Sequence, residues 1–268
     1  MTRVPPPVAL TIAGSDPSGG AGLQADLKTF AALDVWGAAV VAALTAQNTC
    51  GVRACADVAP AFVGAQLDAV LDDLPVAAVK TGMLARAAVV DVVAEGLGAR
   101  RPRLPLVVDP VLVATSGDAL AEPALAARLA ERLLPLATVV TPNLAEAEAL
   151  TGLRATTPAA MRDAARALVD RGARAALVTG GHLAGDPCDV LFDGAAFHDL
   201  VAPRIPLAPT HGTGCTLSAA IAAGLARGLD LLAAVAEAKA FVGRALAAAT
   251  PVGRGAVPLA HGAARRDR

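Results

Sequence analysis

The sequence predicts a doubly wound α/β fold, in which helices cover both faces of a mostly parallel sheet. Strand-length runs at 8–13, 38–44, 76–79, 106–108, 138–140 and 175–178 alternate with longer segments rich in Ala and Leu. The runs are apolar almost throughout instead of alternating with polar residues, which is typical of parallel strands buried on both faces. The intervening segments are long enough to form the helical crossovers that parallel strands need.

Length and composition indicate one domain over residues 1–268. A chain of 268 residues with 55% hydrophobic content can form a large single core. The strand-like runs continue along the chain without an obvious linker, and a predicted helix over 23–33 follows the first of them. Only the basic tail, at 263–268, has the composition of a disordered segment.

Charge and hydropathy exclude several classes of partner. The 23 basic and 24 acidic residues nearly balance and are scattered, and only 2% of the residues are aromatic, so no nucleic-acid surface is expected. No apolar run approaches the ~20 residues that a membrane span requires. The first residues resemble neither a signal peptide nor a transit peptide, which predicts a cytoplasmic protein. The four cysteines show no zinc or CxxC spacing and are expected to be reduced thiols.

The residues after each predicted strand carry the candidate chemistry, because ligands of doubly wound sheets bind beyond the carboxyl ends of the strands. Glycine, proline and polar residues gather in these places, at 14–22, 45–49, 80–83, 109–110, 141–143 and 179–182. Near the end of the sheet, the runs 188–192 and 195–201 flank Asp193-Gly194, a pair typical of hairpin turns. An antiparallel edge hairpin is therefore expected.

The segment 210–216 indicates an anion-binding site. Gly212 and Gly214 allow close backbone approach to a ligand, and an Ala-rich helical stretch at 217–227 follows. The first N–H groups of a helix have no intrahelical partner and suit a phosphate. A glycine-punctuated helix start, with Cys215 as a small buried residue, explains the same pattern.

Two segments early in the chain suggest a site for a small polar ring. The glycine loop 14–22 can close over a substrate, with Asp16 or Asp26 bonding a heterocycle, or can be a connector with Asp16 at a turn. The carboxamide of Gln47 matches the edge of an aminopyrimidine or pyridine ring, although such a residue also caps backbone groups. Met83 fits either the wall of a pocket or the core.

A second group of residues suggests phosphate and metal binding. Lys80 ends a strand and is either directed at an anion or reaches for water. Asn143 and Glu146 have the spacing of a capping box, yet both could lie beside phosphates, with Glu146 holding Mg²⁺ through water. Asp109 is another candidate for the metal on the same edge. His182 and His211 flank glycines and are either proton shuttles or scaffold residues.

Taken together, these blocks resemble the hydroxymethylpyrimidine/phosphomethylpyrimidine kinases of thiamine biosynthesis. The resemblance rests on 12–22, 46–49, 80–84, 108–111, 141–143 and 211–215, in the expected order. It implies a ribokinase-like three-layer α/β/α sandwich with a mostly parallel central sheet, ATP and Mg²⁺ as cofactors, and a homodimer. It also implies two successive phosphorylations of 4-amino-5-hydroxymethyl-2-methylpyrimidine.

The resemblance assigns roles to residues of this chain. It implies that Gly14, Ala21 and Gln47 hold the pyrimidine and that Met83 and Val111 pack against the ring. The anion hole comprises Gly212, Thr213, Gly214 and Cys215, with Cys215 as the base and its pKa lowered by the helix N-terminus. The nucleotide contacts are Asn143, Thr179, Lys80 and Thr213. Thr179 stands where the family commonly has lysine, so Lys80 or a second Mg²⁺ could supply the missing charge.

Other functions remain open at this stage. A pyridoxal or pyridoxine kinase shares the fold and acts on a similar ring, whereas sugar kinases have aspartate at the position of Cys215. A non-catalytic pyrimidine sensor would need neither the anion hole nor Asn143 with Glu146. A nicotinamide-dependent oxidoreductase would need a glycine fingerprint that this sequence lacks.

Overall fold

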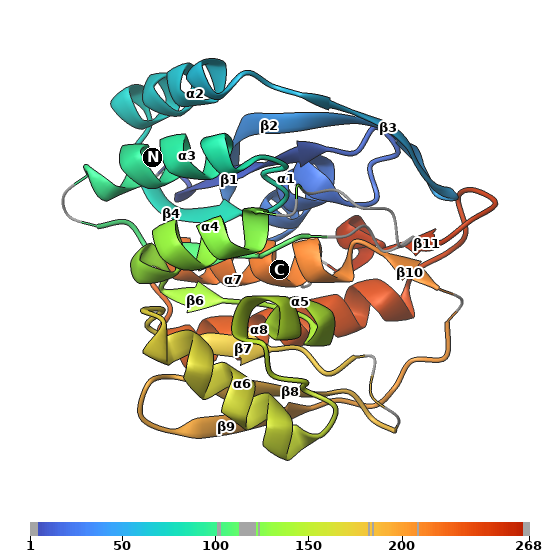
Figure 1. Ribbon diagram of the computed structural model, residues 1–268. Helices are drawn as coiled ribbons and strands as arrows, with labels where there is room; N and C mark the ends of the chain where they lie inside the picture. The colour runs from blue at the N-terminus through green and yellow to red at the C-terminus, as the bar shows by residue number, and fades with distance from the viewer. Residues whose placement is uncertain are drawn as a thin grey trace.

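A mixed sheet forms the centre of the molecule (Figure 1). The computed structural model describes residues 5–100, 103–112, 122, 124–181, 183, 185–207 and 209–264. Within these residues the sheet has nine strands in the order β3-β2-β1-β4-β5-β6-β7-β8-β9. They are β1 (Val8–Ser15), β2 (Trp36–Asn48), β3 (Gly51–Asp57), β4 (Val76–Thr81), β5 (Leu106–Val108), β6 (Val139–Val140), β7 (Ala176–Val178), β8 (Cys188–Phe192) and β9 (Phe197–Val201). The strands from β2 to β7 are parallel, and β3, β8 and β9 are antiparallel to their neighbours.

Two helical layers cover the sheet. One contains α2 (Pro60–Asp73), α3 (Ala87–Gly98), α4 (Leu125–Arg132), α5 (Leu144–Thr151) and α6 (Pro158–Asp170). The other contains α1 (Gly22–Ala32), α7 (Thr213–Ala226) and α8 (Leu231–Ala247). Short 3₁₀ turns, η1 (Leu134–Leu136) and η2 (His261–Ala264), and the small pair β10 (Thr210–His211) and β11 (Val257–Pro258) complete the described structure.

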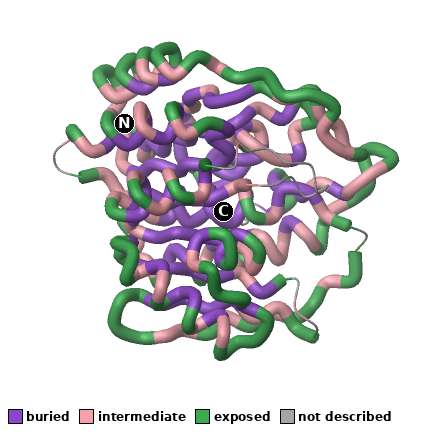
Figure 2. The backbone as a smooth tube through the Cα atoms, in the orientation of Figure 1, coloured by how far each residue is buried: buried purple, intermediate pink, exposed green. Residues whose placement is uncertain are grey.

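The predicted fold class is confirmed, since the molecule is a three-layer α/β/α sandwich with a mostly parallel sheet and an antiparallel edge hairpin. The central strands lie inside the buried zone (Figure 2). Seven of the eight residues of β1 are buried, and β5, β6 and β7 are buried throughout. Such strands contribute side chains to two apolar cores, one on each face of the sheet. This explains why the sequence shows continuous apolar runs here.

The structure corrects the expected end of the second strand. Residues 45–48 belong to β2 rather than to a loop, and they pair with β3, a strand that was not predicted. Most of β3 is exposed, so its residues lack the apolar pattern that reveals a buried strand. Its place in the sheet depends on backbone pairing with β2, which leaves little trace in composition.

Several other boundaries also differ from expectation. Strand β1 ends at Ser15 and β4 at Thr81, each two residues beyond its expected end. Helix α7 begins at Thr213, four residues before the predicted stretch, and β9 begins at Phe197 instead of residue 195. Ala263 and Ala264 lie in η2, with Ala264 fully buried, although the disordered tail was expected to start at 263. Residues 265–268 lie outside the described structure.

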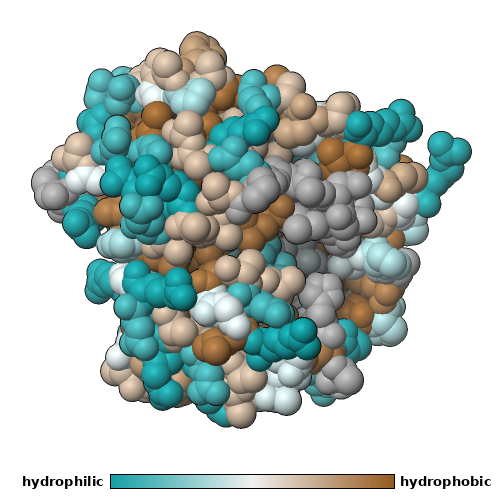
Figure 3. Space-filling model, viewed as in Figure 1, coloured by the Kyte–Doolittle hydropathy of each residue, from teal (hydrophilic) through white to brown (hydrophobic). Residues whose placement is uncertain are grey.

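Several helices begin at residues that the sequence marks clearly. The Asn143 side chain caps α5, Thr157 caps α6 ahead of Pro158, and Asp230 caps α8. Gly152, with a φ of 80°, ends α5 in the left-handed conformation that glycine favours. Hydrophilic side chains cover much of the outer surface of the helices on the face drawn in Figure 3. Among the described residues, no helix combines the length and apolar character needed to cross a membrane.

Candidate active site

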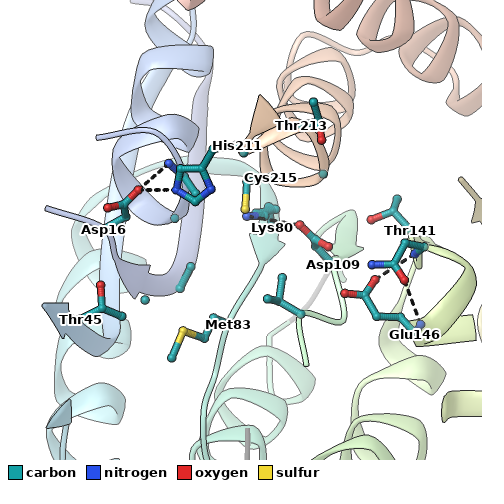
Figure 4. Close-up of a pocket in the computed structure, with 18 of the residues that line it drawn as sticks. Asp16, Thr45, Lys80, Met83, Asp109, Thr141, Glu146, His211, Thr213 and Cys215 are labelled. Carbon is teal, nitrogen blue, oxygen red and sulfur yellow. Dashed lines mark hydrogen bonds and ion pairs between the residues drawn. The ribbon is translucent and has the colours of Figure 1, made fainter. Parts of the chain in front are cut away.

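A cavity of about 340 Å³ lies at the carboxyl ends of the parallel strands. Its wall includes Gly14 near the end of β1, Gln47 of β2, Asp109 after β5 and Cys215 at the start of α7. Figure 4 shows Asp16, Thr45 and Met83 on one side of Cys215 and Lys80, and Asp109, Thr141 and Glu146 on the other. The cavity therefore has two ends with Cys215 between them.

The N-terminus of α7 forms the middle of this cavity. Gly212 precedes the helix with a φ of 85°, and a Cβ atom there would lie 1.9 Å from the carbonyl oxygen of Gly20. Only glycine fits this junction. The first-turn residues Thr213, Gly214 and Cys215 all line the cavity, so the amides that α7 itself cannot pair face a ligand site. This arrangement suits an anion, and anion binding at these residues stays a prediction.

Gly214 is a glycine for a different reason. It is exposed, and a Cβ atom at this position would meet no atom within 4 Å. Packing therefore does not require glycine here, and alanine would favour the helix. The open space beside the amide is what a phosphate group needs in order to approach closely.

The surroundings of Cys215 contradict one prediction. Burial raises the pKa of the Cys215 thiol to about 12, although the charge of Lys80 and the N–H of Gly22 act in the opposite direction. The helix N-terminus was expected to lower this pKa. Desolvation has the larger effect, although Cys215 is half-buried as a residue and lines the cavity, so the thiol is neutral at physiological pH without a bound ligand.

Lys80 and Asp26 form a buried ion pair beneath the cavity. The Lys80 ammonium donates to Asp26 Oδ2 at 2.8 Å and to Oδ1 at 3.0 Å, and it lies 3.9 Å from Asp109 Oδ2. Burial alone would lower the pKa of Lys80, but the charge of Asp26, the charge of Asp109 and the hydrogen bond to Asp26 raise it. Lys80 is thus a fixed cation with no exposed surface.

This pair changes two predicted roles. Asp26 does not line the cavity; its carboxylate accepts from Lys80 and from the Thr11 hydroxyl at 2.6 Å, so the structure offers it no contact with a substrate. Lys80 does line the cavity, but its ammonium is committed to Asp26 instead of being free for a phosphate. A buried charge needs such a partner, and sequence alone did not reveal that α1 supplies it.

Asp109 and Glu146 bring two carboxylates to the other end of the cavity. Burial and then the charge of Asp109 raise the pKa of Glu146 to about 8, although the N–H groups of Asn143 and Leu112 lower it. Burial also raises the pKa of Asp109, which accepts from Ser218 Oγ at 2.9 Å. A divalent cation between them would relieve this repulsion, and Mg²⁺ prefers such oxygen ligands.

The donor set fits Mg²⁺ better than metals that need a protein cage. Within the described residues, no cluster of three or more His, Cys, Asp or Glu side chains could hold a metal. Mg²⁺ commonly keeps several waters and is shared between one or two carboxylates and substrate phosphates. Asp109 and Glu146 together meet that requirement.

Asn143 and Glu146 also form the capping box that the sequence suggested. Asn143 Oδ1 accepts from the Glu146 N–H at 3.0 Å, and Glu146 Oε2 accepts from the Asn143 N–H at 2.9 Å. Asn143 pairs in turn with Thr179 through an isolated backbone bridge, and all three residues line the cavity. Capping therefore positions these side chains at the cavity wall without removing them from it.

Asp16 organises the glycine loop at the first end of the cavity. Its carboxylate accepts from the N–H and hydroxyl of Ser18, from the N–H groups of Gly20 and Ala21, and from His211 Nε2 at 2.9 Å. Burial by itself would raise the pKa of Asp16, but the bonds from His211, Ser18 and Ala21 lower it to about 2. Asp16 thus holds the loop in shape and joins it to β10.

Gln47 lies in the same corner. One end of its carboxamide is 3.1 Å from His211 Nε2, and the other end is 3.1 Å from Thr45 Oγ1. Met83 and Val111 supply apolar surface, and a Cβ atom on Gly14 would lie only 3.0 Å from Met83 Sδ. This end of the cavity has the mixture of flat apolar walls and few polar groups that suits a small ring.

Among the described residues, every candidate site residue named from the sequence except Asp26 lines this cavity. Sequence reasoning missed some neighbours and left His211 without a partner; Ser15, Thr45, Thr141 and Ala145 also belong to the wall. Their positions at the carboxyl edge were a usable signal, but their residue types were too common to single out. His182, the other candidate histidine, lies outside the described residues.

Known proteins resemble this chain over nearly its whole length. The phosphomethylpyrimidine kinase family model matches residues 16–260. A hydroxymethylpyrimidine/phosphomethylpyrimidine kinase from Rhizobium meliloti strain 1021 is 55% identical over 95% of this chain and 96% of its own length. Among solved structures, pyridoxal kinase from Staphylococcus aureus in complex with AMP-PCP and pyridoxal has a TM-score of 0.88 at 35% identity, covering 96% of this chain and 94% of that one.

A second solved structure carries the pyrimidine name. Phosphomethylpyrimidine kinase from Clostridium difficile 630 has a TM-score of 0.79 at 39% identity and covers 89% of this chain and 99% of that one. These matches extend over nearly the whole molecule, so they include both ends of the cavity. This chain belongs to the phosphomethylpyrimidine kinase family.

Proposed function

We propose that this protein transfers phosphoryl groups from ATP to 4-amino-5-hydroxymethyl-2-methylpyrimidine and then to the resulting monophosphate, in thiamine biosynthesis. The observation that carries the proposal is the two-ended cavity with the α7 N-terminus at its middle. One end suits a small ring and the other suits phosphates with a metal. The acceptor oxygen and the transferred phosphoryl group would meet at Cys215 and the free amides.

In this proposal the ring lies at the end formed by the glycine loop and β2. Gln47 bonds its polar edge, and Met83 and Val111 pack against its faces, with Gly14 and Ala21 leaving room beside them. This places the hydroxymethyl group toward Cys215.

The nucleotide phosphates lie toward the opposite end. The amides of Thr213, Gly214 and Cys215 stabilise the negative charge that accumulates on the transferred group. Asn143 and Thr179 contact the nucleotide, and Asp109 with Glu146 would hold Mg²⁺, partly through water. Mg²⁺ supplies neutralisation of phosphate charge at this point. Lys80 adds a fixed positive charge from beneath the cavity floor, with no direct phosphate contact.

The first transfer forms a P–O bond to the hydroxymethyl oxygen and breaks the bond between the γ-phosphoryl group and ADP. The hydroxyl proton must leave, and Cys215 is the side chain placed to receive it. Because burial raises the pKa of Cys215, the thiol can act as a base only if the bound complex favours its thiolate. The second transfer has a phosphate acceptor that is already largely ionised near neutral pH.

Pyridoxal is the competing substrate, since pyridoxal kinases are close structural relatives. The experiment that decides is mass spectrometry of products after incubation with Mg²⁺, ATP and equal amounts of the pyrimidine and pyridoxal. We expect the pyrimidine diphosphate. Exclusive formation of pyridoxal phosphate would overturn the pyrimidine assignment, and intact ATP with no product would indicate a non-catalytic pyrimidine-binding protein.

A homodimer and a cytoplasmic location stay predictions. The exposed Trp36 and Leu44 of β2 support the first, because apolar side chains of this size on one strand suit a subunit contact. Sedimentation analysis of the purified protein would measure the molecular mass in solution.

A further inference from the structure

Gln47 and His211 meet in a hydrogen-bond network whose chemistry fixes the direction of the Gln47 carboxamide. As placed, Gln47 Nε2 faces His211 Nε2 at 3.1 Å and Oε1 faces Thr45 Oγ1 at 3.1 Å. The oxygen and nitrogen of a primary amide have nearly the same shape, so the partners on each side decide which atom belongs where.

The first constraint comes from Asp16. Its carboxylate accepts from Ser18, Gly20 and Ala21, and the backbone N–H groups among these partners can only donate. His211 Nε2 lies 2.9 Å from Asp16 Oδ2, so it must carry a hydrogen to avoid facing the carboxylate with a lone pair. The same Nε2–H then faces Gln47, which must present its oxygen.

The second constraint is independent and comes from Thr45. Its hydroxyl has a single hydrogen, and the carbonyl oxygen of Ser15, 2.9 Å away, can only accept that hydrogen. Thr45 Oγ1 can therefore only accept from Gln47, and the amide end that faces it must be the NH₂ group. Both constraints require the same orientation, with the Gln47 oxygen toward His211 and the nitrogen toward Thr45.

Packing prevents the imidazole from moving away. A Cβ atom on Gly20 would lie 2.6 Å from His211 Cδ2, so the ring fits closely against the glycine loop, and its side chain is only 9% exposed. Figure 4 shows the contact between Asp16 and His211 at the edge of the cavity. The network is thus rigid on the side away from the ligand.

We propose that the Asp16–His211 pair, together with Thr45, determines substrate specificity by locking the direction of the Gln47 carboxamide. A locked Gln47 carboxamide presents its N–H donor and its oxygen acceptor to the ring in one fixed arrangement. An aminopyrimidine edge, with its amino donor beside a ring-nitrogen acceptor, matches one order; the 4-oxo analogue, with a carbonyl beside a ring N–H, matches only the reverse. A freely turning amide would accept both rings. The inference rests on the proposed pyrimidine kinase activity.

The test compares two substrates in three variants. His211→Leu removes the donor to Gln47, and Thr45→Val, nearly isosteric and suited to a strand, removes the acceptor. His198→Leu is the matched control, because His198 forms a similar pair with Asp193 at 2.8 Å in the β8–β9 hairpin outside the cavity. The measurement is kcat/KM for 4-amino-5-hydroxymethyl-2-methylpyrimidine and for its 4-oxo analogue, with KM for ATP measured alongside.

We expect His211→Leu and Thr45→Val each to lower the amino-to-oxo ratio of kcat/KM by roughly tenfold, about the worth of one hydrogen bond. KM for ATP should stay unchanged, and His198→Leu should keep the wild-type ratio. An unchanged ratio in Thr45→Val, whether or not His211→Leu folds, would overturn the inference. A wild-type enzyme that phosphorylates neither pyrimidine would instead overturn the proposed function.

Discussion

Burial and the charge of Lys80 act in opposite directions on the pKa of the Cys215 thiol. Burial favours the neutral thiol, whereas Lys80 and the Gly22 N–H favour the thiolate, and burial dominates in the ligand-free structure. The backbone N–H groups beside Cys215 need no change of protonation, because they are hydrogen-bond donors with or without a bound ligand. At the residue scale we therefore expect the backbone to contribute more to phosphoryl transfer than the thiol does.

Cys215→Ala separates these contributions by using the two transfers of the proposed reaction. If the thiol is a base, its loss should slow phosphorylation of the hydroxymethyl group by roughly 100-fold or more, the usual worth of general-base catalysis. The phosphate acceptor needs no base, so the second transfer should slow much less. Single-turnover rates with each purified acceptor provide the measurement. Equal losses in the two steps would show that Cys215 acts by shape and not as a base.

Gly212 and Gly214 are expected to respond differently to substitution by alanine. Gly214→Ala should leave stability unchanged or raise it by up to about 1 kcal/mol, because alanine favours the helix and meets no neighbour. Its methyl group should displace the bound phosphate and lower kcat/KM by roughly 100-fold. Thermal unfolding and steady-state kinetics measure both effects.

Gly212→Ala should behave in the opposite manner. Its φ of 85° and a Cβ position 1.9 Å from the Gly20 carbonyl oxygen make alanine strained, so stability should fall by more than about 1 kcal/mol. A stable Gly212→Ala variant, or a fully active Gly214→Ala variant, would contradict this division of roles.

At the element scale, the Lys80–Asp26 pair joins β4 to α1 under the site. Removing one partner leaves an unpaired buried charge, so Lys80→Met should cost about 3–5 kcal/mol of unfolding free energy. The double variant Lys80→Met/Asp26→Leu removes both charges and should recover most of that loss. Urea unfolding of the singles and the double gives the coupling energy. A double variant that loses the sum of the two single effects would show that the pair is not coupled.

The carboxyl edge collects the site because of how the elements pack. Lys80 points to the face covered by α1 and α7, where Asp26 and Cys215 lie, and Asp109 from β5 comes within 3.9 Å of it. The helices thus supply both the charge partner and the anion hole. A change in the packing of α1 would therefore be transmitted to the floor of the cavity.

At the scale of the whole molecule, Asp16 gives a pH dependence of stability. The pKa of Asp16 is lowered to about 2 in the folded protein from the ordinary aspartate value of 3.8, so the folded state binds its proton less readily than the unfolded state. The resulting stabilisation is fully present above about pH 4 and is lost as the pH falls toward 2. Its size is about 2 kcal/mol. The difference in unfolding free energy between wild type and Asp16→Asn should shrink by that amount between pH 5 and pH 2; parallel curves would contradict the assignment.

Much of the fold and site was predictable because buried parallel strands and glycine-rich turns leave strong local patterns. The strand 106–108 was predicted with its observed ends, and residues from 14 to 215 were expected at one edge, where the cavity lies. The exposed strand β3 escaped prediction because it has no buried face. Likewise, Asp26 was predicted as a possible ligand contact because a sequence does not show whether a side chain on a helix points toward the cavity or toward the sheet.

The sequence by itself determined the layer order, the carboxyl-edge cluster and the family of this protein, since each depends on local pattern or on contiguous motifs. The tertiary structure alone decided which charges face each other. It paired Lys80 with Asp26, which lies 54 positions away, and His211 with Asp16, which lies 195 positions away. It also placed Cys215 where desolvation raises the pKa. Charge, burial and hydrogen-bond direction depend on neighbours that folding brings together, and the linear order of residues does not record those neighbours.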